Sequence, residues 1–445
     1  MTAQTPVKLR GGETRSLLVR LLGGLVVGVA TMYCGPAART GKGRRREGAG
    51  LYPELGVLGI QEGTSPALVL EVGRQTALLP SYEIARQELA EHGLDLDVKE
   101  VHGIGRHAGQ AALAYRRREL EFYRRGELSA GTGHGKRLGA MIDGGRIKLR
   151  KATRKQKGRG RSKKQKRRFK TEWREVKQII VFEMDECGRM KKDTQPIVDG
   201  TFGGPDEIME VLAMRLHQVG ASQADVVAFR TDGATWMWGR LEWVIRRVGL
   251  SAEQVSKGLD WCHAVHHIGL ALGLILAEAE RTRVLKKMKK WLKGGSWRKV
   301  VDELLRLAGG TDLTEDSTVW TEIGYLDRHG REGHLDYATY RRRGLPLGSG
   351  AIESAIRRVI NLRLKGNSIF WEEENAEALL VLRGLVLSGR WNEVFAKITE
   401  SLAYNRRLDW HWTSPDMTAD LKAGIIITPP TPQTSASQAG YAAAA

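Results

Sequence analysis

The chain has 445 residues, of which 41% are hydrophobic, and a net charge of +20 at pH 7. The length allows two to four domains, and the apolar content is ordinary for a soluble globular protein. Three widely spaced cysteines exclude a disulfide framework and a paired CxxC zinc site, and they favour a reducing cytosol.

Residues 1–50 form a basic N-terminal segment rich in glycine and arginine. Residues 17–33 are its most apolar stretch, but Arg20 interrupts the stretch, and the uninterrupted part is too short to span a bilayer. Its valine-rich half with glycine breaks predicts a small β-hairpin, so we expect no membrane association.

Residues 51–128 predict a helical domain. Two amphipathic stretches, starting at Ser81 as a helix N-cap and at about residue 98, are separated by a glycine-containing turn. This pattern is compatible with a helix-turn-helix whose second helix, over about 98–109, would enter the major groove of DNA. Plain helical packing explains the pattern equally well.

An alternating α/β region follows over residues 129–245. A helix is expected at 206–220, and apolar runs predict strands at 137–143, 176–186, 194–202 and 225–231. The first and last of these strands stop at Asp143 and Asp232, and each aspartate precedes a glycine.

A basic segment directly follows Asp143. Residues 146–170 contain 15 Lys or Arg and no Asp or Glu, which accounts for most of the net charge. We expect a flexible arm that contacts a nucleic-acid backbone, because each neutralised phosphate releases counterions.

Residues 246–340 predict an all-helical insertion, and residues 341–400 return to the α/β core. The second part opens with a Gly-Ser-Gly loop and a helix that carries Glu353 in its first turn. On that helix, Arg357 and Asn361 follow Glu353 at i+4 and i+8, which places them on one face. Residues 401–445 predict a largely disordered tail.

Together these elements predict an α/β protein. Its core is a ribonuclease-H-like mixed sheet with an all-helical insertion, preceded by a helical DNA-binding domain. Carboxylates at strand ends and helix starts can converge on one point, so Asp143, Asp232 and Glu353 predict a catalytic site for two Mg²⁺ or Mn²⁺ ions. Taken singly, each aspartate is better explained as a turn residue, and Glu353 with Arg357 as a surface ion pair; only the three together favour a catalytic site.

Two further groups are expected around the triad. His263 and His267 lie one helical turn apart and are expected to support the site, since no second cluster completes a zinc site with them. The expected DNA contacts are basic side chains of the arm and of the Glu353 helix: Arg146, Lys148, Arg150, Lys151, Lys163, Lys164, Arg167, Arg168, Arg357, Arg363 and Lys365.

Several sequence frames resemble bacterial DDE transposases of the Kra insertion-sequence family, and more distantly Mutator-type transposases. They are IDGGRIKLR, TEWREVKQIIVFEMDECGR, DGTFGGPDEIMEVLAMRLHQVGA, RTDGATWMW, LDWCHAVHH and GSGAIESAIRRVINLRLKGN. The resemblance runs from about residue 51 to 391. The family also carries a paired-cysteine element near the N-terminus, where this chain has only Cys34.

The resemblance implies a cytoplasmic bacterial enzyme that acts on double-stranded DNA, both transposon ends and target. Water would cut the transposon end, and the freed 3′-hydroxyl would attack the target by phosphoryl transfer. A homo-oligomer in synapsis is also implied. The alternatives are a ribonuclease-H-like nuclease without strand transfer and a domesticated, non-catalytic DNA-binding protein.

Overall fold

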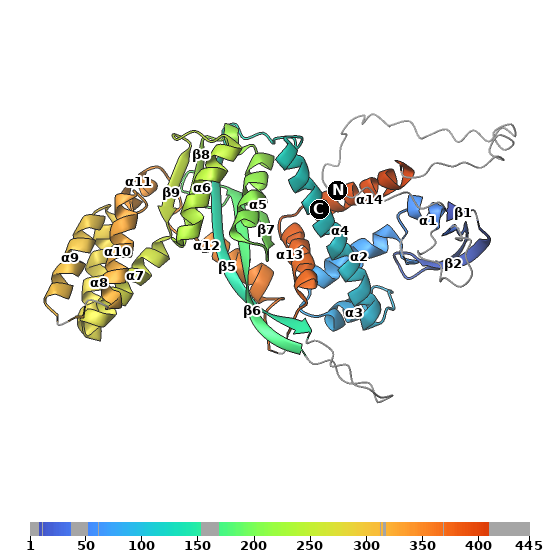
Figure 1. Ribbon diagram of the computed structural model, residues 1–445, viewed down its shortest axis with the longest axis horizontal. Helices are drawn as coiled ribbons and strands as arrows, with labels where there is room; N and C mark the ends of the chain where they lie inside the picture. The colour runs from blue at the N-terminus through green and yellow to red at the C-terminus, as the bar shows by residue number, and fades with distance from the viewer. Residues whose placement is uncertain are drawn as a thin grey trace, which may run out of the picture.

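The computed structural model describes residues 9–10, 12–36, 52–60, 62–152, 169–311, 313–314, 317–367 and 369–408. Figure 1 shows a central sheet with helices on its faces, a helical lobe at one end, and further helices with a small hairpin at the other. The protein is therefore mixed α/β, as the sequence predicts.

The central sheet has five strands in the order β7-β6-β5-β8-β9. Strand β6 runs antiparallel to β5 and β7, whereas β8 is parallel to β5 and β9 is parallel to β8. β6 is therefore the one strand of this sheet that opposes the rest. The strands are β5 (Arg137–Ala152), β6 (Phe169–Glu183), β7 (Ile197–Thr201), β8 (Val226–Thr231) and β9 (Val255–Leu259).

Side chains of β5 point alternately to the two faces of the sheet, and each face packs against its own hydrophobic core. Ile142 faces a cluster that includes α5 (Pro205–Gln218) and α6 (Thr235–Val248), while Met141 faces the opposite cluster. Residues of α12 (Gly350–Ile356) belong to that opposite cluster. The sheet is thus buried on both faces, which explains why β8 is apolar almost throughout.

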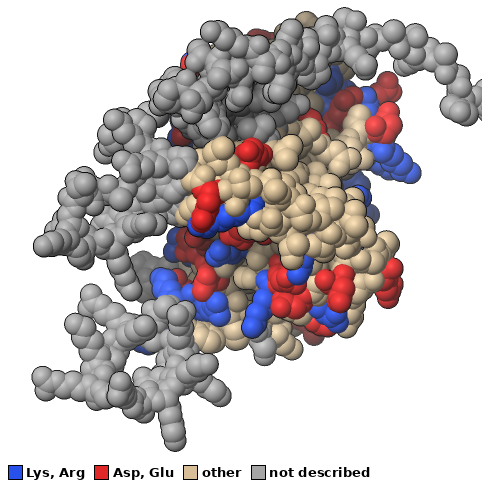
Figure 2. Space-filling view, turned by 90° about the vertical axis from the view of Figure 1, so that its right-hand side faces the viewer, with Lys and Arg blue, Asp and Glu red and all other residues tan. Residues whose placement is uncertain are grey.

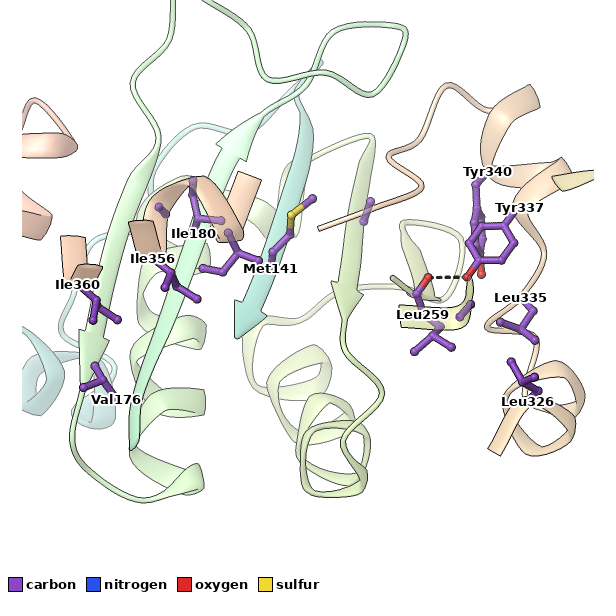
Figure 3. Close-up of a cluster of buried hydrophobic side chains, with 14 of the residues drawn as sticks. Met141, Val176, Ile180, Leu259, Leu326, Leu335, Tyr337, Tyr340, Ile356 and Ile360 are labelled. Atoms are coloured by element: carbon purple, nitrogen blue, oxygen red, sulfur yellow. Dashed lines mark hydrogen bonds between the residues drawn. The ribbon is translucent and has the colours of Figure 1, made fainter. Parts of the chain in front are cut away.

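Helix α12 continues into a π-helical turn, η2 (Arg357–Asn361). Figure 3 shows Ile356 and Ile360 of these two elements lying over β5 and β6, near Met141, Val176 and Ile180. This packing fixes α12, and with it Glu353, against the face of the sheet that Met141 and Asp143 share.

The helical lobe comprises α7 (Trp261–Ile275), α8 (Glu278–Lys293), α9 (Trp297–Gly309), α10 (Thr318–Arg331) and α11 (Tyr337–Arg342). The expected all-helical stretch 246–340 is wrong at its start, because it contains β9. That strand has polar residues at Ser256 and Lys257 and a glycine at 258, so it has no strong apolar period of its own. It becomes a strand by pairing with β8.

The N-terminal helices are α1 (Pro53–Val57), α2 (Pro66–Leu78), α3 (Tyr82–Glu91) and α4 (Val98–Arg125). Ser81 caps α3 as expected, since its side chain accepts a hydrogen bond from the Ile84 amide at 3.1 Å. Asp97 starts α4 with a capping box, and Gly126 ends it in a left-handed conformation. Helix α4 has 28 residues and extends well past the predicted end at about 109.

Buried ion pairs join α4 to the sheet. Arg116 Nη1 lies 3.2 Å from Asp199 Oδ1 of β7, and Arg215 of α5 contacts both Asp199 (2.7 Å) and Glu119 of α4 (2.8 Å). All four side chains are at least nine-tenths buried. Helix α4 is therefore a central packing element, which favours the packing interpretation of the 81–110 hairpin over a free recognition helix.

Helices α13 (Glu373–Leu387) and α14 (Trp391–Leu408) pack against α2 and α4. Helix α14 continues past residue 400, where a disordered tail was expected, and residues 409–445 lie outside the described residues. A short 3₁₀ turn, η1 (Ala221–Gln223), precedes β8.

The N-terminal segment contains strands β1 (Leu9–Arg10), β2 (Thr14–Arg20), β3 (Val26–Met32) and β4 (Gly35–Pro36). β2 and β3 form the antiparallel hairpin predicted for the apolar stretch 17–33. Across the described residues, the helices are all too short or too polar to cross a membrane.

Figure 2 views the end of the molecule that carries these N-terminal elements. Among the described residues on this face, Lys and Arg alternate with Asp and Glu and do not gather into one basic surface. The described residues of this face therefore form no uniform electrostatic footprint for DNA.

Candidate active site

Asp143 and Asp232 lie side by side on the sheet. The parallel register of β5 and β8 pairs Met141 with Arg230, so two residues further on Asp143 lies beside Asp232. Because side chains alternate along a strand, Asp143 shares the face of Met141. Asp232 directly follows the last residue of β8, as predicted.

The prediction that the first strand stops at Asp143 is wrong. Strand β5 continues through two glycines to Ala152, and Asp143 pairs with Gln178 in the middle of the β5–β6 ladder. The glycines serve close packing here, because a Cβ on Gly145 would lie 2.9 Å from Ile360 Cδ1. Gly145 makes room for α12 and η2, whereas a Cβ on Gly144 would meet Glu175 of β6, and neither glycine ends the strand.

Glu353 reaches this face from α12. The helix begins at Gly350, and Glu353 is in its first turn, exposed to solvent. The Ser349 hydroxyl lies 3.4 Å from Glu353 Oε1 and donates to it. The alternative interpretation of Glu353, an ion pair with Arg357, does not form among the described residues, so this carboxylate has no basic side-chain partner there.

Asp143 interacts electrostatically with Asp232, Glu353 and His263. Burial, helped by the negative charges of Asp232 and Glu353, raises the pKa of Asp143 to about 6 against the opposing effects of the Gly144 amide and His263. The Gly144 N–H donates to Asp143 Oδ1 at 2.6 Å. The structure therefore brings the three sequence-predicted carboxylates and His263 into one electrostatic site.

One functional residue was missed by the sequence reasoning. Asp260, fully buried at the N-cap of α7, accepts hydrogen bonds from the His263 amide and from His263 Nδ1, both at 2.9 Å. Its other oxygen accepts from the Ser349 amide at 2.6 Å. Burial alone would raise the pKa of Asp260, but these hydrogen bonds outweigh burial and lower it. The signal was an N-cap aspartate three residues before a histidine.

Asp260 in turn sets the charge of His263. The hydrogen bond that His263 donates to Asp260 raises the pKa of His263 above its ordinary value, and the charges of Asp232 and Asp143 add to the effect. The imidazole is thus held in place next to the carboxylates in a state that readily carries a positive charge.

The helical lobe contacts the Asp232 turn through Tyr325 of α10. The Tyr325 hydroxyl donates to the Asp232 carbonyl at 2.8 Å, and Gly233 has a left-handed φ of +86°. His267 stacks on the Tyr325 ring with centroids 3.8 Å apart, and its Nδ1 forms a short hydrogen bond with Glu322. His267 therefore supports the site through Tyr325 and not by direct contact with the carboxylates.

The three carboxylates are suited to hard divalent cations. Within the described part of the chain, none of them is paired with Lys or Arg, and their side-chain partners are backbone amides and one hydroxyl. Such uncompensated, converging oxygens match the ligand preference of Mg²⁺ or Mn²⁺.

The basic arm starts as a β-ribbon. Beyond Gly145, the β5–β6 ladder continues with Arg146 opposite Glu175, Lys148 opposite Trp173 and Arg150 opposite Thr171. Figure 1 shows this two-stranded ribbon running past the other strands. The expected flexible arm is therefore ordered at its base.

The predicted DNA-contacting residues separate into groups. Arg146, Arg150, Lys151, Arg357 and Lys365 are exposed and Lys148 is partly exposed. Two of them form ion pairs, Arg150 with Glu372 at 2.8 Å and Lys151 with Glu172 at 2.6 Å. Lys163, Lys164, Arg167 and Arg168 lie outside the described residues.

The prediction for Arg363 is wrong. Its side chain is buried, with the guanidinium 4.9 Å from the Tyr82 ring centroid and 5.2 Å from that of Trp371. The π-helical turn η2 widens the helix just before this position. Arg363 joins α3 to the core and is unavailable to DNA.

Comparison of the chain with protein-family models, with curated proteins and with solved structures gives no match. Its function is therefore inferred from its residues and their geometry.

Proposed function

We propose that the protein is a DDE transposase, a metal-dependent enzyme that cuts and joins DNA strands by phosphoryl transfer. The observation that carries the proposal is the convergence of three carboxylates. Asp143 lies beside Asp232 at adjacent parallel strands, and Glu353 reaches the same face from α12, so that their negative charges oppose one another. Carboxylates that destabilise one another in this way are characteristic of sites that function with bound cations.

The sheet supports the proposal. Numbered in chain order, the strands are arranged third, second, first, fourth, fifth, and only the second is antiparallel to the others. We infer a ribonuclease-H-like core from this order, with acids on the adjacent first and fourth strands. The helical lobe α7–α11 then lies between the second and third acids in sequence, as in the DDE transposases that the sequence resembles.

Asp143, Asp232 and Glu353 would hold the ions, which when bound supply charge neutralisation at the scissile phosphate and activation of the attacking oxygen. The protein's own part is positioning. Asp260 orients His263, and this imidazole can present positive charge to a phosphate beside the carboxylates. The same Asp260 holds the loop before Glu353.

The β5–β6 ribbon is the proposed DNA contact. A two-stranded ribbon fits the major groove, and this one presents exposed Arg146 and Arg150 with the exposed indole of Trp173. Lys148 Nζ lies 5.1 Å from the Trp173 ring centroid. Exposed Arg357 and Lys365 would extend the contact beside Glu353. Binding two transposon ends and a target would require a homo-oligomer.

The test uses the full-length protein and a plasmid that carries the DNA flanking its reading frame on both sides. We expect Mg²⁺- or Mn²⁺-dependent strand cleavage and joining of the new 3′-ends to a labelled target. Asp143→Asn, Asp232→Asn and Glu353→Gln should each abolish cleavage while DNA binding survives. The exposed Asp302→Asn and Glu121→Gln are matched controls that should retain it.

The products separate the alternatives. Cleavage without joining would replace the proposal with a nuclease that uses the same residues. DNA binding with no metal-dependent cleavage would indicate a non-catalytic DNA-binding protein. Full activity in any one of the three variants would remove that residue from the site.

A further inference from the structure

A second cluster of ligand-type side chains lies next to the turn that carries Asp232. It consists of His329 in the last turn of α10, Glu332 at the C-cap of that helix, and His334 two residues later. His329 Nδ1 and His334 Nδ1 are 3.1 Å apart, and Glu332 Oε2 lies 3.2 Å from His334 Nδ1 and 3.7 Å from His329 Nδ1. The three atoms thus form a nearly equilateral triangle.

The size of this triangle fits a tetrahedral metal ion. Zinc–nitrogen and zinc–oxygen bonds of about 2.0–2.2 Å place neighbouring ligand atoms roughly 3.3–3.5 Å apart. The three observed distances bracket that value. The ligand set of two imidazoles and one carboxylate is also one that zinc uses, whereas imidazole is a poor ligand for Mg²⁺.

The backbone holds the ligands in place before any ion binds. Gly333, with φ of +78°, turns the chain so that the His334 amide donates to the His329 carbonyl at 2.9 Å. The His334 carbonyl accepts from the Leu259 amide at the end of β9 at 3.0 Å. Both imidazoles are at least nine-tenths buried, and Trp238 of α6 stacks on His334 with centroids 3.8 Å apart.

Hydrogen bonds alone cannot satisfy all three atoms of this triangle. A neutral imidazole carries one proton, and the two Nδ1 atoms face each other at 3.1 Å. One proton between the two Nδ1 atoms satisfies that pair, but it leaves Glu332 Oε2 facing a lone pair on His334 or on His329. A cation at the centre of the triangle relieves this opposition of acceptor atoms.

The Nε2 side of His329 would have to adapt to a metal. A metal on Nδ1 leaves the proton on Nε2, where a hydrogen-bond acceptor is then required. Arg328 Nη2 lies 3.3 Å from Nε2 and would have to turn away. Arg328 is exposed, so this movement is unhindered.

We propose that His329, Glu332 and His334 bind one Zn²⁺ ion per chain, with solvent as the fourth ligand on the side of the half-exposed Glu332. The ion would join the end of α10 to β9 and α6, and so fix the helical lobe against the turn of Asp232. This zinc site is separate from the carboxylate site, and its three ligands lie within six residues of one another in the chain.

The test measures metal on the full-length protein after chelation and dialysis, first with Zn²⁺ by calorimetry and elemental analysis, then with Co²⁺ as a spectroscopic probe. We expect one Zn²⁺ per chain, visible absorption bands of tetrahedral Co²⁺, and a Zn²⁺-dependent rise in the thermal unfolding midpoint. Glu332→Gln and His334→Gln should each weaken Zn²⁺ binding by roughly tenfold or more.

Two controls locate the ion. The double variant Asp143→Asn, Asp232→Asn removes the carboxylate site and should bind Zn²⁺ as the wild type does. The exposed His266→Gln of α7 should also have no effect. Because Glu332 is half-exposed, Glu332→Gln should fold, so equal Zn²⁺ affinity in that variant and the wild type overturns the proposal. Failure of the wild type to bind Zn²⁺ overturns it too.

Discussion

Replacing Gly233 by alanine should destabilise the protein by two separate effects. The residue has a left-handed φ of +86°, which costs an alanine roughly 1–2 kcal/mol. Its Cβ would also lie 2.1 Å from Tyr325 Oη and 2.7 Å from Leu259 Cδ1, and relieving such overpacking costs typically about 1–3 kcal/mol. The expected total is about 2–5 kcal/mol of unfolding free energy.

The matched control is Gly249→Ala. Gly249 has a similar φ of +79° at the end of α6, but an added Cβ there meets nothing within 4 Å. Its cost should be the backbone term alone, about 1–2 kcal/mol. The difference between the two variants isolates the approach of Tyr325 to the Asp232 turn.

Chemical denaturation followed by tryptophan fluorescence measures both variants, and Tyr325→Phe completes a double-mutant cycle. Tyr325→Phe should lose about 1 kcal/mol in the wild type, because its hydroxyl bonds the Asp232 carbonyl. In the Gly233→Ala background it should cost less, or even stabilise, since the clashing hydroxyl is gone. If Gly233→Ala and Gly249→Ala were equally destabilised, the contact between the helical lobe and the Asp232 turn would be refuted.

The remaining predictions concern the site and its rim. A raised pKa means that ionised Asp143 destabilises the metal-free fold as pH rises from about 4 to 6. Asp143→Asn should therefore exceed the wild type in unfolding free energy by up to about 3 kcal/mol at pH 7 without metal, and by little at pH 4, in parallel denaturation curves. In Asp260→Asn, an NH₂ group replaces one of the two accepting oxygens and faces another donor, so we expect the free energy of unfolding to fall by roughly 1.5–3 kcal/mol. The pKa of His263 should also be lower, which histidine NMR measures. Arg363→Ala should reduce stability by roughly 2–4 kcal/mol, because the guanidinium packs between two aromatic rings. Arg357→Ala should instead reduce DNA affinity and lower its salt slope by about one at unchanged stability.

The first three of these predictions have a clear contrary result. A pH-independent stability difference between Asp143→Asn and the wild type would mean that Asp143 is not destabilised by its neighbours. An unchanged His263 pKa in Asp260→Asn would break the proposed coupling. DNA affinity that falls in Arg363→Ala without any loss of stability would place that side chain at the surface.

The core elements that could be predicted are those with strong local signals. The helix 206–220 and the strand before Asp232 are both long apolar patterns with clear boundaries, and the structure has α5 and β8 at these places. Ser81 as an N-cap was likewise readable from its residue type. In each case, the local preference and the tertiary environment agree.

The elements that were missed depend on partners far away in the chain. Strand β9 exists because β8 pairs with it, and β5 continues past its glycines because β6 and Ile360 accommodate them. The role of Asp260 could not be predicted from its N-cap position, because its second oxygen bonds the Ser349 amide, 89 residues later. His329 and His334 carry no recognisable spacing until Gly333 folds the chain back.

Asp260 has a consequence for how such proteins change over evolutionary time. It lies at the entrance to the helical lobe and bonds the loop just after its exit, so the two ends of the excursion meet at one buried carboxylate. Loop-closure entropy grows slowly, by about 0.6 kcal/mol for each doubling of length. The outer helices α8 and α9 could therefore be lengthened, trimmed or exchanged while Glu353 keeps its place opposite the aspartates. The outer helices are thus the exchangeable part of the lobe, because the hydrogen bond between Asp260 and Ser349 holds the two ends of the lobe in place.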